Sequence, residues 1–152
     1  MAEMKKAYHL ISEMKKLRSI RGSGTQLISV YIPAGYQLSE EVNKLRNEYS
    51  QSSNIKSKTT RTNVLSAIDK IMQYLKLYRQ TPPNGLAVFC GNISDNPSKD
   101  DIALFSVETP LPLKVNIYRC DSSFFLDPIE EMIDATDMYA LVVMDGREAT
   151  VA

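Results

Sequence analysis

The chain has 152 residues, of which 43% are hydrophobic and 24% are charged, and its formal net charge is zero. These values are typical of one globular domain with a core, and they exclude a largely disordered chain. A zero net charge also excludes a global attraction to nucleic acid, so any such binding must come from a local basic patch.

The cysteines and the histidine do not predict a metal site. Cys90, Cys120 and His9 are too few to supply the four protein ligands of a structural zinc ion. The N-terminal residues lack the apolar core of a signal peptide, so we expect a cytoplasmic protein with reduced thiols. No apolar run approaches the length of a membrane span, and we expect no membrane contact, metal or cofactor.

The chain begins with a helix and a strand. Residues 3–20 place apolar side chains at helical spacing and predict an amphipathic helix. The turn Arg21-Gly22-Ser23-Gly24-Thr25 ends this helix, since two glycines in three residues favour a tight turn. Residues 26–32 (QLISVYI) are rich in β-branched side chains and predict a strand, which ends at Pro33-Ala34-Gly35.

Two further helices are predicted next, with a polar segment between them. Ser39 is predicted as the N-cap of the first, with Glu40 and Glu41 in its first turn. Its apolar face is predicted to consist of Leu38, Val42, Leu45 and Tyr49. The second helix is predicted over residues 59–78, because the proline-bearing residues 81–85 forbid its continuation.

The second half of the chain is rich in β-strand signals. Residues 86–90, 102–107 and 115–120 predict three strands, with a polar loop at residues 92–100. Asp127 as an N-cap, with Pro128 at the first helical position, predicts a short helix.

Residues 139–144 predict one more strand, followed by the turn signal Asp145-Gly146. A lone hairpin is not stable by itself, so residues 138–152 are expected to open a second, truncated domain or to add to the sheet edge. Helices and strands do not alternate, which disfavours a doubly wound parallel sheet. The sequence predicts an α+β domain: a mostly antiparallel four-stranded sheet packed with helices, with a projecting helical hairpin.

The segment between the hairpin helices, residues 51–58 (QSSNIKSK), has almost nothing apolar to bury. It lacks glycine and proline, which a simple connection would use. Lys56 and Lys58 lie near a helix N-terminus, where free amide groups favour an anion over a cation. Asn54 adds a donor and an acceptor, and Arg61 follows. The segment therefore suits contact with RNA, although a solvated basic loop also explains its composition.

Two short motifs are more specific when they are taken together. The first is Asn54-Ile55-Lys56-Ser57 (NIKS), and the second is Tyr118-Arg119-Cys120-Asp121-Ser122-Ser123-Phe124 (Y-x-C-x-x-x-F). In this order, with Gly24-Thr25 upstream, they resemble the hallmark motifs of the N-terminal domain of archaeal and eukaryotic class-one translation termination (release) factors. The resemblance covers about residues 8–137, and residues 139–146 are similar to the start of that family's middle domain.

The resemblance implies that residues 1–137 read an mRNA stop codon beside ribosomal RNA in the ribosomal A site. Asn54, Ile55, Lys56 and Ser57 are implied to lie against the first uridine, whose carbonyl acceptors suit the donor-only ammonium group of a lysine. The resemblance also implies a pocket for the purine bases, with stacking and edge contacts from Tyr118, Cys120 and Phe124. Glu48 matches a family glutamate that can accept from an adenine amino group, and Lys58 and Arg61 suit RNA phosphates.

One element departs from the family pattern. The Gly-Thr-Ser element of the eukaryotic factors is here Gly24-Thr25-Gln26. Glutamine also hydrogen-bonds purines, but it is longer, so the stop codons that the chain accepts are not fixed by the resemblance. Gln51 and Ser52 also differ from the eukaryotic threonine and alanine, which favours an archaeal type of factor.

Simpler explanations exist for several of these residues. Tyr118 and Cys120 are two apart and share one face of a strand, so either can belong to the core. Gly24 can serve only as a helix cap, and Glu48 can pair with Lys44 one helical turn away.

Three functional hypotheses follow. The first is a monomeric stop-codon-recognition module. In the full-length factor, this module would be coupled to peptidyl-tRNA hydrolysis and to an elongation-factor-like translational GTPase. The alternative is an RNA- or ribosome-binding module of a related surveillance or termination paralogue. The second hypothesis is a fragment whose catalytic part lies elsewhere. The chain has no Gly-Gly-Gln, so we expect no hydrolase activity from it alone. The third, an enzyme with a phosphate loop at Gly22-x-Gly24, is disfavoured because no Gly-Lys-Ser/Thr follows.

Overall fold

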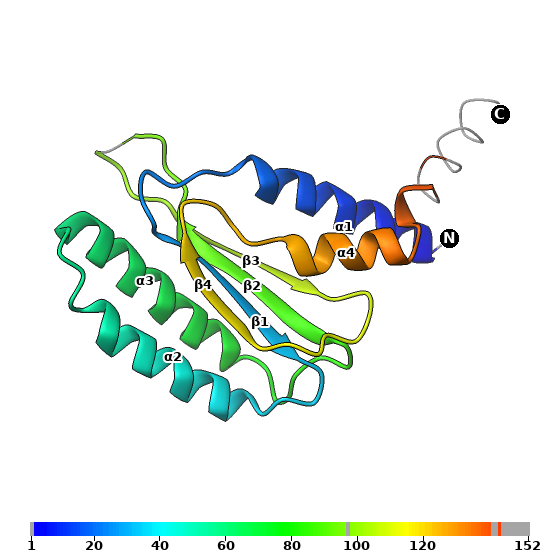
Figure 1. Ribbon diagram of the computed structural model, residues 1–152, viewed down its shortest axis with the longest axis horizontal. Coiled ribbons are helices and arrows are strands. Elements are labelled where there is room, and N and C mark those ends of the chain that lie inside the picture. Colours follow the sequence, from blue (N-terminus) through cyan, green and yellow to red (C-terminus); the bar gives the residue numbers. More distant parts are fainter. Residues whose placement is uncertain (1, 97, 141–142, 144–152) are drawn as a thin grey trace. The chain divides into compact units, whose positions relative to one another are not determined.

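The computed structural model describes residues 2–96, 98–140 and 143 (Figure 1). The chain divides into two compact units, of which the larger is Ile20–Phe125 and the other joins Met1–Ser19 to Leu126–Ala152. The larger unit holds two helices and four strands: β1 (Leu27–Pro33), α2 (Leu38–Ser52), α3 (Lys58–Leu75), β2 (Gly85–Asn92), β3 (Ile102–Glu108) and β4 (Ile117–Asp121).

The four strands form one sheet in the order β3-β2-β1-β4, and every neighbouring pair is antiparallel. The central strand β1 pairs with β2 on one side, where Val30 lies opposite Val88. It pairs with β4 on the other, where Ile28 lies opposite Cys120 and Val30 opposite Tyr118. The predicted α+β class and the four-stranded antiparallel sheet are therefore confirmed.

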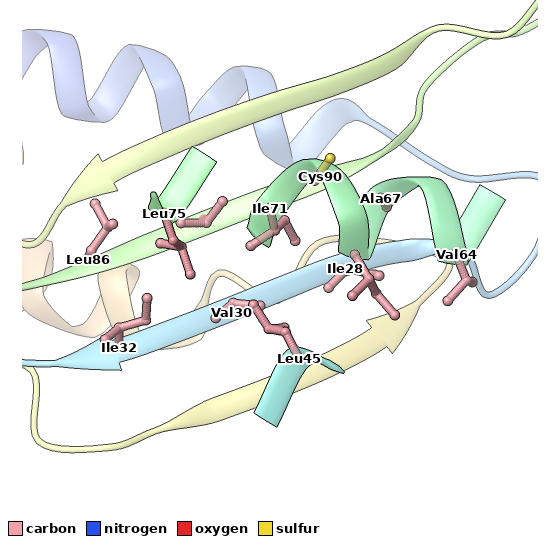
Figure 2. Close-up of a cluster of buried hydrophobic side chains, with 12 residues drawn as sticks. Ile28, Val30, Ile32, Leu45, Val64, Ala67, Ile71, Leu75, Leu86 and Cys90 are labelled. Carbon is pink, nitrogen blue, oxygen red and sulfur yellow. The ribbon is translucent and has the colours of Figure 1, made fainter. Parts of the chain in front are cut away.

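Helices α2 and α3 form the predicted helical hairpin and pack on one face of the sheet (Figure 1). Alternate residues of β1 and β2 point into this layer, because successive side chains of a strand face opposite sides. They meet the inner face of α3 in a fully buried cluster, shown in Figure 2, that includes Ile28, Val30, Leu45, Val64, Ile71, Leu86 and Cys90. This packing fixes where the hairpin begins and ends along the sheet.

The opposite face of the same sheet carries an aromatic cluster. Tyr31 of β1 packs edge-on against Phe89 of β2, with ring centroids 5.7 Å apart. Phe124, which follows β4, packs against Phe89 at 5.6 Å and against Phe105 at 6.4 Å. The hydroxyl of Tyr31 donates to the backbone carbonyl of Phe125. The chain after β4 is therefore anchored on the face away from the hairpin.

Two details of α2 differ from the sequence prediction. The helix begins at Leu38 and its N-cap is Gln37, so the prediction of Ser39 as N-cap was wrong. The carbonyl of Gln37 accepts from the N–H groups of Glu40 and Glu41, so the first helical turn begins before Ser39. Tyr49 was predicted on the apolar face but is 39% exposed. The inner face in the last turns instead runs through Leu45, which is buried, and Glu48 and Ser52, which are half-buried.

The second unit contains α1 (Ala2–Ser19) and α4 (Asp127–Ala135). Arg18 of α1 donates from Nε to the Glu130 carboxylate of α4 at 2.9 Å. The N-cap of α4 is Leu126, whose carbonyl accepts from Ile129 and Glu130, so the prediction of Asp127 as N-cap was wrong by one residue. Asp127 lies in the first turn, where its negative charge still suits the helix dipole.

The strand predicted over residues 139–144 is not found where the structure describes this segment. Tyr139, Ala140 and Val143 are helical, and the rest of that segment and the Asp145-Gly146 turn lie outside the described residues. A helix satisfies its own backbone groups, whereas a strand needs a partner strand for its hydrogen bonds.

The packing of α2 on the sheet yields a stability prediction. Leu45 is 1% exposed, so Leu45→Ala leaves a cavity and is expected to lower the free energy of unfolding by about 2–5 kcal/mol in urea denaturation. Leu77→Ala is the matched control, because Leu77 is 79% exposed and its truncation is expected to cost under about 0.5 kcal/mol. Equal losses from the two variants would contradict this packing.

Candidate nucleic-acid interface

The connection between α2 and α3 is short and closed by its own backbone. The N–H groups of Ser53, Asn54 and Ile55 donate to carbonyls of the last turn of α2 at 3.1–3.2 Å. Ser57 is the N-cap of α3, and its hydroxyl oxygen accepts from the N–H of Thr60 at 3.3 Å. Ser57 therefore satisfies one of the free donors at the start of α3, a role that the sequence prediction did not assign to it.

Arg61 holds this connection from within α3. Its guanidinium Nη1 donates to the carbonyl of Ile55 at 3.0 Å. The side chain of Ile55 is half-buried and packs against the core beneath the hairpin. Ile55 is thus held through its side chain and its carbonyl, and Arg61, predicted as an RNA contact, has a structural partner at this point.

Three polar side chains of the tip face solvent: Asn54, Lys56 and Lys58 are all exposed. The first turn of α3 contains no acidic residue, so no carboxylate there competes for its N–H groups. The cations and the helix N-terminus at this tip both favour an anionic partner.

Tyr118 and Cys120 lie on the hairpin face of the edge strand β4 and pack partly against the core. Ser52 at the end of α2 is close enough to the Tyr118 hydroxyl to lower the pKa of Tyr118, although this effect is smaller than that of burial. Burial, followed by the charges of Cys120 and Glu48, raises the pKa of Tyr118. Burial first, and then the carboxylates of Asp121 and Glu48, raise the pKa of the Cys120 thiol to about 11. Glu48, Tyr118 and Cys120 are therefore neighbours, and the tyrosine and cysteine stay protonated at neutral pH.

The turn that contains Gly24 and Thr25 joins this group. The Cys120 Sγ donates to the carbonyl of Thr25 at 3.0 Å, and the N–H of Gly22 donates to the carbonyl of Ser122 at 2.8 Å. A Cβ built on Gly24 would lie 3.5 Å from the Thr60 hydroxyl in the first turn of α3. The turn therefore lies between β4 and the start of α3, next to the tip.

Two predicted site residues lie elsewhere. The Gln26 side chain is buried, with 3% exposed, and its amide bonds to Asn63 and to the carbonyl of Asn92. Phe124 is 6% exposed and lies in the aromatic cluster on the other face of the sheet. The structure thus brings together Gly24, Thr25, Glu48, Tyr118 and Cys120 near the NIKS tip, and it does not add the side chains of Gln26 and Phe124 to that surface.

A cavity of about 330 Å³ opens between α2 and β4, lined in part by Lys44, Glu48, Gln51 and Tyr118. Lys44 donates to the Asn116 Oδ1 at 2.8 Å, and Asn116 donates to the buried carboxylate of Glu41 at 2.8 Å. The amide of Asn116 therefore partners Lys44, the residue that the sequence suggested for Glu48.

The sequence prediction missed several residues that lie in or beneath this surface: Ser52, Asn63, Asn92 and Asn116. A signal was present for some of them. Ser52 lies one turn after Glu48 on α2, and Asn63 precedes Ala67 by four residues on the inner face of α3, where polar side chains are rare. Nothing in the local pattern indicates that Asn63 and Asn92, 29 residues apart, bond to each other.

Within the described residues, His, Cys, Asp and Glu side chains form no group of three or more that is suited to a metal ion. Over the same residues, no helix combines the length and apolar character that crossing a bilayer requires.

The fold and this surface define an α+β domain that presents a cationic hairpin tip beside a polar edge strand. The profile of the family described as "eRF1 domain 1" matches residues 5–134, and the chain belongs to this family.

Relatives and a solved structure agree with this assignment. Over 144 residues the chain is 52% identical to peptide chain release factor subunit 1 of Pyrococcus abyssi. This alignment covers 95% of this chain and 35% of that protein. Over 151 residues it is 44% identical to the protein of the same name from Methanocaldococcus jannaschii, covering 99% and 36%. The crystal structure of an archaeal translation termination factor, aRF1, superposes with a TM-score of 0.75 at 37% identity over 84% of this chain and 34% of that one. The chain thus spans about a third of the length of these relatives.

The surroundings of Cys120 yield a chemical prediction. With a pKa of about 11, roughly one thiol in a thousand is ionised at pH 8, so alkylation by iodoacetamide is expected to be slow. Asp121→Asn removes a carboxylate that raises this pKa, so it lowers the pKa and is expected to speed alkylation, followed by mass spectrometry of the Cys120 peptide. Asp69→Asn, on the exposed side of α3, is the control, and equal rates in both variants would contradict the assigned cause.

Proposed function

We propose that this chain is the stop-codon-recognition domain of a translation termination factor. The observation that carries the proposal is the exposed NIKS tip, which is held by backbone bonds and by Arg61 while Asn54 and Lys56 remain unburied. Preorganised donors recognise a base at lower entropic cost than mobile ones. Membership of the release-factor domain family supports the same assignment.

In this proposal, the tip reads the first base of the codon. All stop codons begin with uridine, which shows carbonyl acceptors where cytidine shows an amino donor. The ammonium group of Lys56 is a donor only, and Asn54 supplies both a donor and an acceptor. Ile55 and Ser57 act differently, because their packing and capping contacts hold the tip in place. Lys58 lies at the start of α3 and suits an RNA phosphate.

The purine bases are assigned to the neighbouring surface formed by Gly24, Thr25, Glu48, Tyr118 and Cys120. Tyr118 offers an aromatic ring, and the carboxylate of Glu48 accepts from an adenine amino group. Phe124 supports this surface from a distance, because it anchors the chain after β4 in the aromatic cluster on the other face. We assign it a positioning role.

In the full-length factor, recognition by this chain is coupled to peptidyl-tRNA hydrolysis in another part of the protein. The matched relatives are about three times as long as this chain, and no Gly-Gly-Gln occurs in its sequence. We infer that residues 1–137 form the recognition domain and that residues 138–152 begin the middle domain. The partners of this proposal are the mRNA stop codon, ribosomal RNA and an elongation-factor-like translational GTPase, all in the cytoplasm.

The first-base assignment predicts a uniform defect. Lys56→Ala in the full-length factor is expected to reduce peptide release at UAA, UAG and UGA alike, because the three codons share the first uridine. Loss of one base contact corresponds to about 1–3 kcal/mol, measured as the ratio of kcat/KM on ribosomes programmed with each codon.

Lys76→Ala is the matched control, since Lys76 is an exposed lysine at the opposite end of α3. It is expected to release peptide like the parent factor. A defect of Lys56→Ala confined to one stop codon would show that the tip does not read the first base.

Arg61 yields a second prediction, since it bonds to Ile55 and was expected to contact RNA. Arg61→Lys keeps the positive charge but loses the planar guanidinium that reaches the Ile55 carbonyl. We expect faster amide hydrogen exchange at residues 54–57 and a release defect of about tenfold at every stop codon. If Arg61→Lys keeps the amide exchange rates and the peptide release rates of the parent factor, Arg61 acts only as a positive charge toward a phosphate.

A further inference from the structure

A buried network of three amide side chains lies beneath the turn that contains Gly24 and Thr25. Gln26, Asn63 and Asn92 are all buried. Gln26 directly precedes β1, Asn63 lies in α3, and Asn92 is the last residue of β2. Asn63 Nδ2 donates to Gln26 Oε1 at 3.1 Å, and Asn92 Nδ2 donates to Asn63 Oδ1 at 3.2 Å. Gln26 Nε2 reaches the backbone carbonyl of Asn92 at 3.4 Å, which closes the ring.

The network extends from Asn92 into the loop between β2 and β3. Asn92 Nδ2 also donates to the Asp100 carboxylate at 3.1 Å, and Asn92 Oδ1 accepts from the N–H groups of Ser94 and Asp101. The orientation of Asn92 is therefore fixed by its own loop, because its oxygen is needed for two N–H groups and its nitrogen for a carboxylate.

This fixed orientation determines the orientation of Gln26. Asn92 presents its amide N–H to Asn63, so Asn63 accepts with its oxygen and offers its nitrogen to Gln26. A flipped Gln26 would place its oxygen against the Asn92 carbonyl and its nitrogen against the Asn63 nitrogen. Both pairs would be mismatched in a buried place, where an unpaired polar group is costly.

Gln26 directly follows the turn that the proposed function places against the purine bases, and its N–H donates to the carbonyl of Gly24. The turn is bonded on its other side to β4, through Cys120 and Thr25 and through Gly22 and Ser122. Its remaining side faces α3, where Thr60 lies near Gly24 and Asn63 bonds to Gln26.

We propose that Asn63 and Asn92 are positioning residues for stop-codon specificity: they hold the Gln26 amide in one orientation and away from the codon. This inference rests on the proposed function. A free glutamine amide matches either purine, because it can turn its oxygen to the adenine amino group or its nitrogen to the guanine carbonyl. Held inside, Gln26 leaves discrimination to the fixed groups of the Gly24–Thr25 turn and of β4.

The test is a double-mutant cycle in the full-length factor. Asn63→Leu keeps nearly the same shape and removes both hydrogen-bonding groups, which frees the Gln26 amide. Peptide release is measured on ribosomes programmed with UAA, UAG, UGA and the tryptophan codon UGG. We expect release at UGG, relative to UAA, to rise by at least about threefold in Asn63→Leu.

The second arm removes the amide that the network holds. In a Gln26→Leu background, Asn63→Leu is expected to leave the UGG-to-UAA ratio within about twofold of Gln26→Leu alone, because no amide remains to be released. Ser66→Leu, at an exposed position of the same helix, is the control and is expected to keep the parental ratio. Thermal unfolding of each variant shows that it is folded, and Asn63→Asp, which lacks the N–H donor for Gln26, replaces Asn63→Leu if that variant does not fold.

Two outcomes overturn the inference. One is a parental UGG-to-UAA ratio in folded Asn63→Leu, and the other is an equal effect of Asn63→Leu with and without Gln26. Stop-codon-dependent release by the parent factor tests the proposed function separately. If the parent factor releases peptide at stop codons but the double-mutant cycle shows no coupling between Asn63 and Gln26, this inference is wrong and the proposed function stands.

Discussion

The packing of α2 and α3 on one face of the sheet is the constraint from which the rest of the surface follows. Leu45, Ile68 and Ile71 are fully buried in this layer, so neither helix can slide along the sheet without opening a cavity. The five residues between the helices have little freedom once both ends are fixed. Ile55 adds a side chain to the same core, and Arg61 bonds to its carbonyl. The apolar layer beneath the tip therefore restricts it to one conformation, although the tip contains neither glycine nor proline.

The two faces of the sheet divide the second sequence motif. Tyr118 and Cys120 are two residues apart and point to the hairpin, whereas Phe124, after the end of β4, packs with Phe89 and Phe105 on the other side. The motif therefore combines two half-buried residues on the hairpin face with a buried phenylalanine on the other face of the sheet. The Cys120 bond to the Thr25 carbonyl extends the arrangement to a turn nearly a hundred residues earlier. The residues of one short motif therefore lie on opposite faces of the sheet and share no common surface.

Local signals in the sequence were sufficient for most elements of the fold. The β-branched residues of the segment 26–32, which ends at Pro33-Ala34-Gly35, predicted β1. Helical spacing of apolar residues in the segment 59–78 predicted α3. The caps were less predictable, because Gln37 and Leu126 act through their backbone carbonyls and carry no side-chain signal. The helical state of Tyr139 was missed because an apolar run of six residues fits a strand or a helix equally well until its partners are known.

The candidate site was predictable only in part. The exposed tip followed from local composition, and its neighbours followed from the resemblance of the motifs. The burial of Gln26 did not, because it depends on Asn63 and Asn92, which are 37 and 66 residues away along the chain. A glutamine that follows a glycine turn looks like a surface residue until the structure supplies two buried amide partners. Hydrogen bonds between polar side chains that are far apart in the chain produce no periodic pattern in a single sequence.

The helix N-termini differ in the charges of their first turns. The first turns of α2 and α4 contain acidic residues, Glu40 and Glu41 in one and Asp127 and Glu130 in the other, as the helix dipole favours. The first turn of α3 has none and begins with Lys58, beside Lys56. Because α3 lacks such a carboxylate, it is less stable by about 0.3–1 kcal/mol than it would be with one. An anion bound at the tip would supply the missing interaction with the helix dipole. Among α2, α3 and α4, the helix that follows the NIKS tip is thus the one without a carboxylate in its first turn.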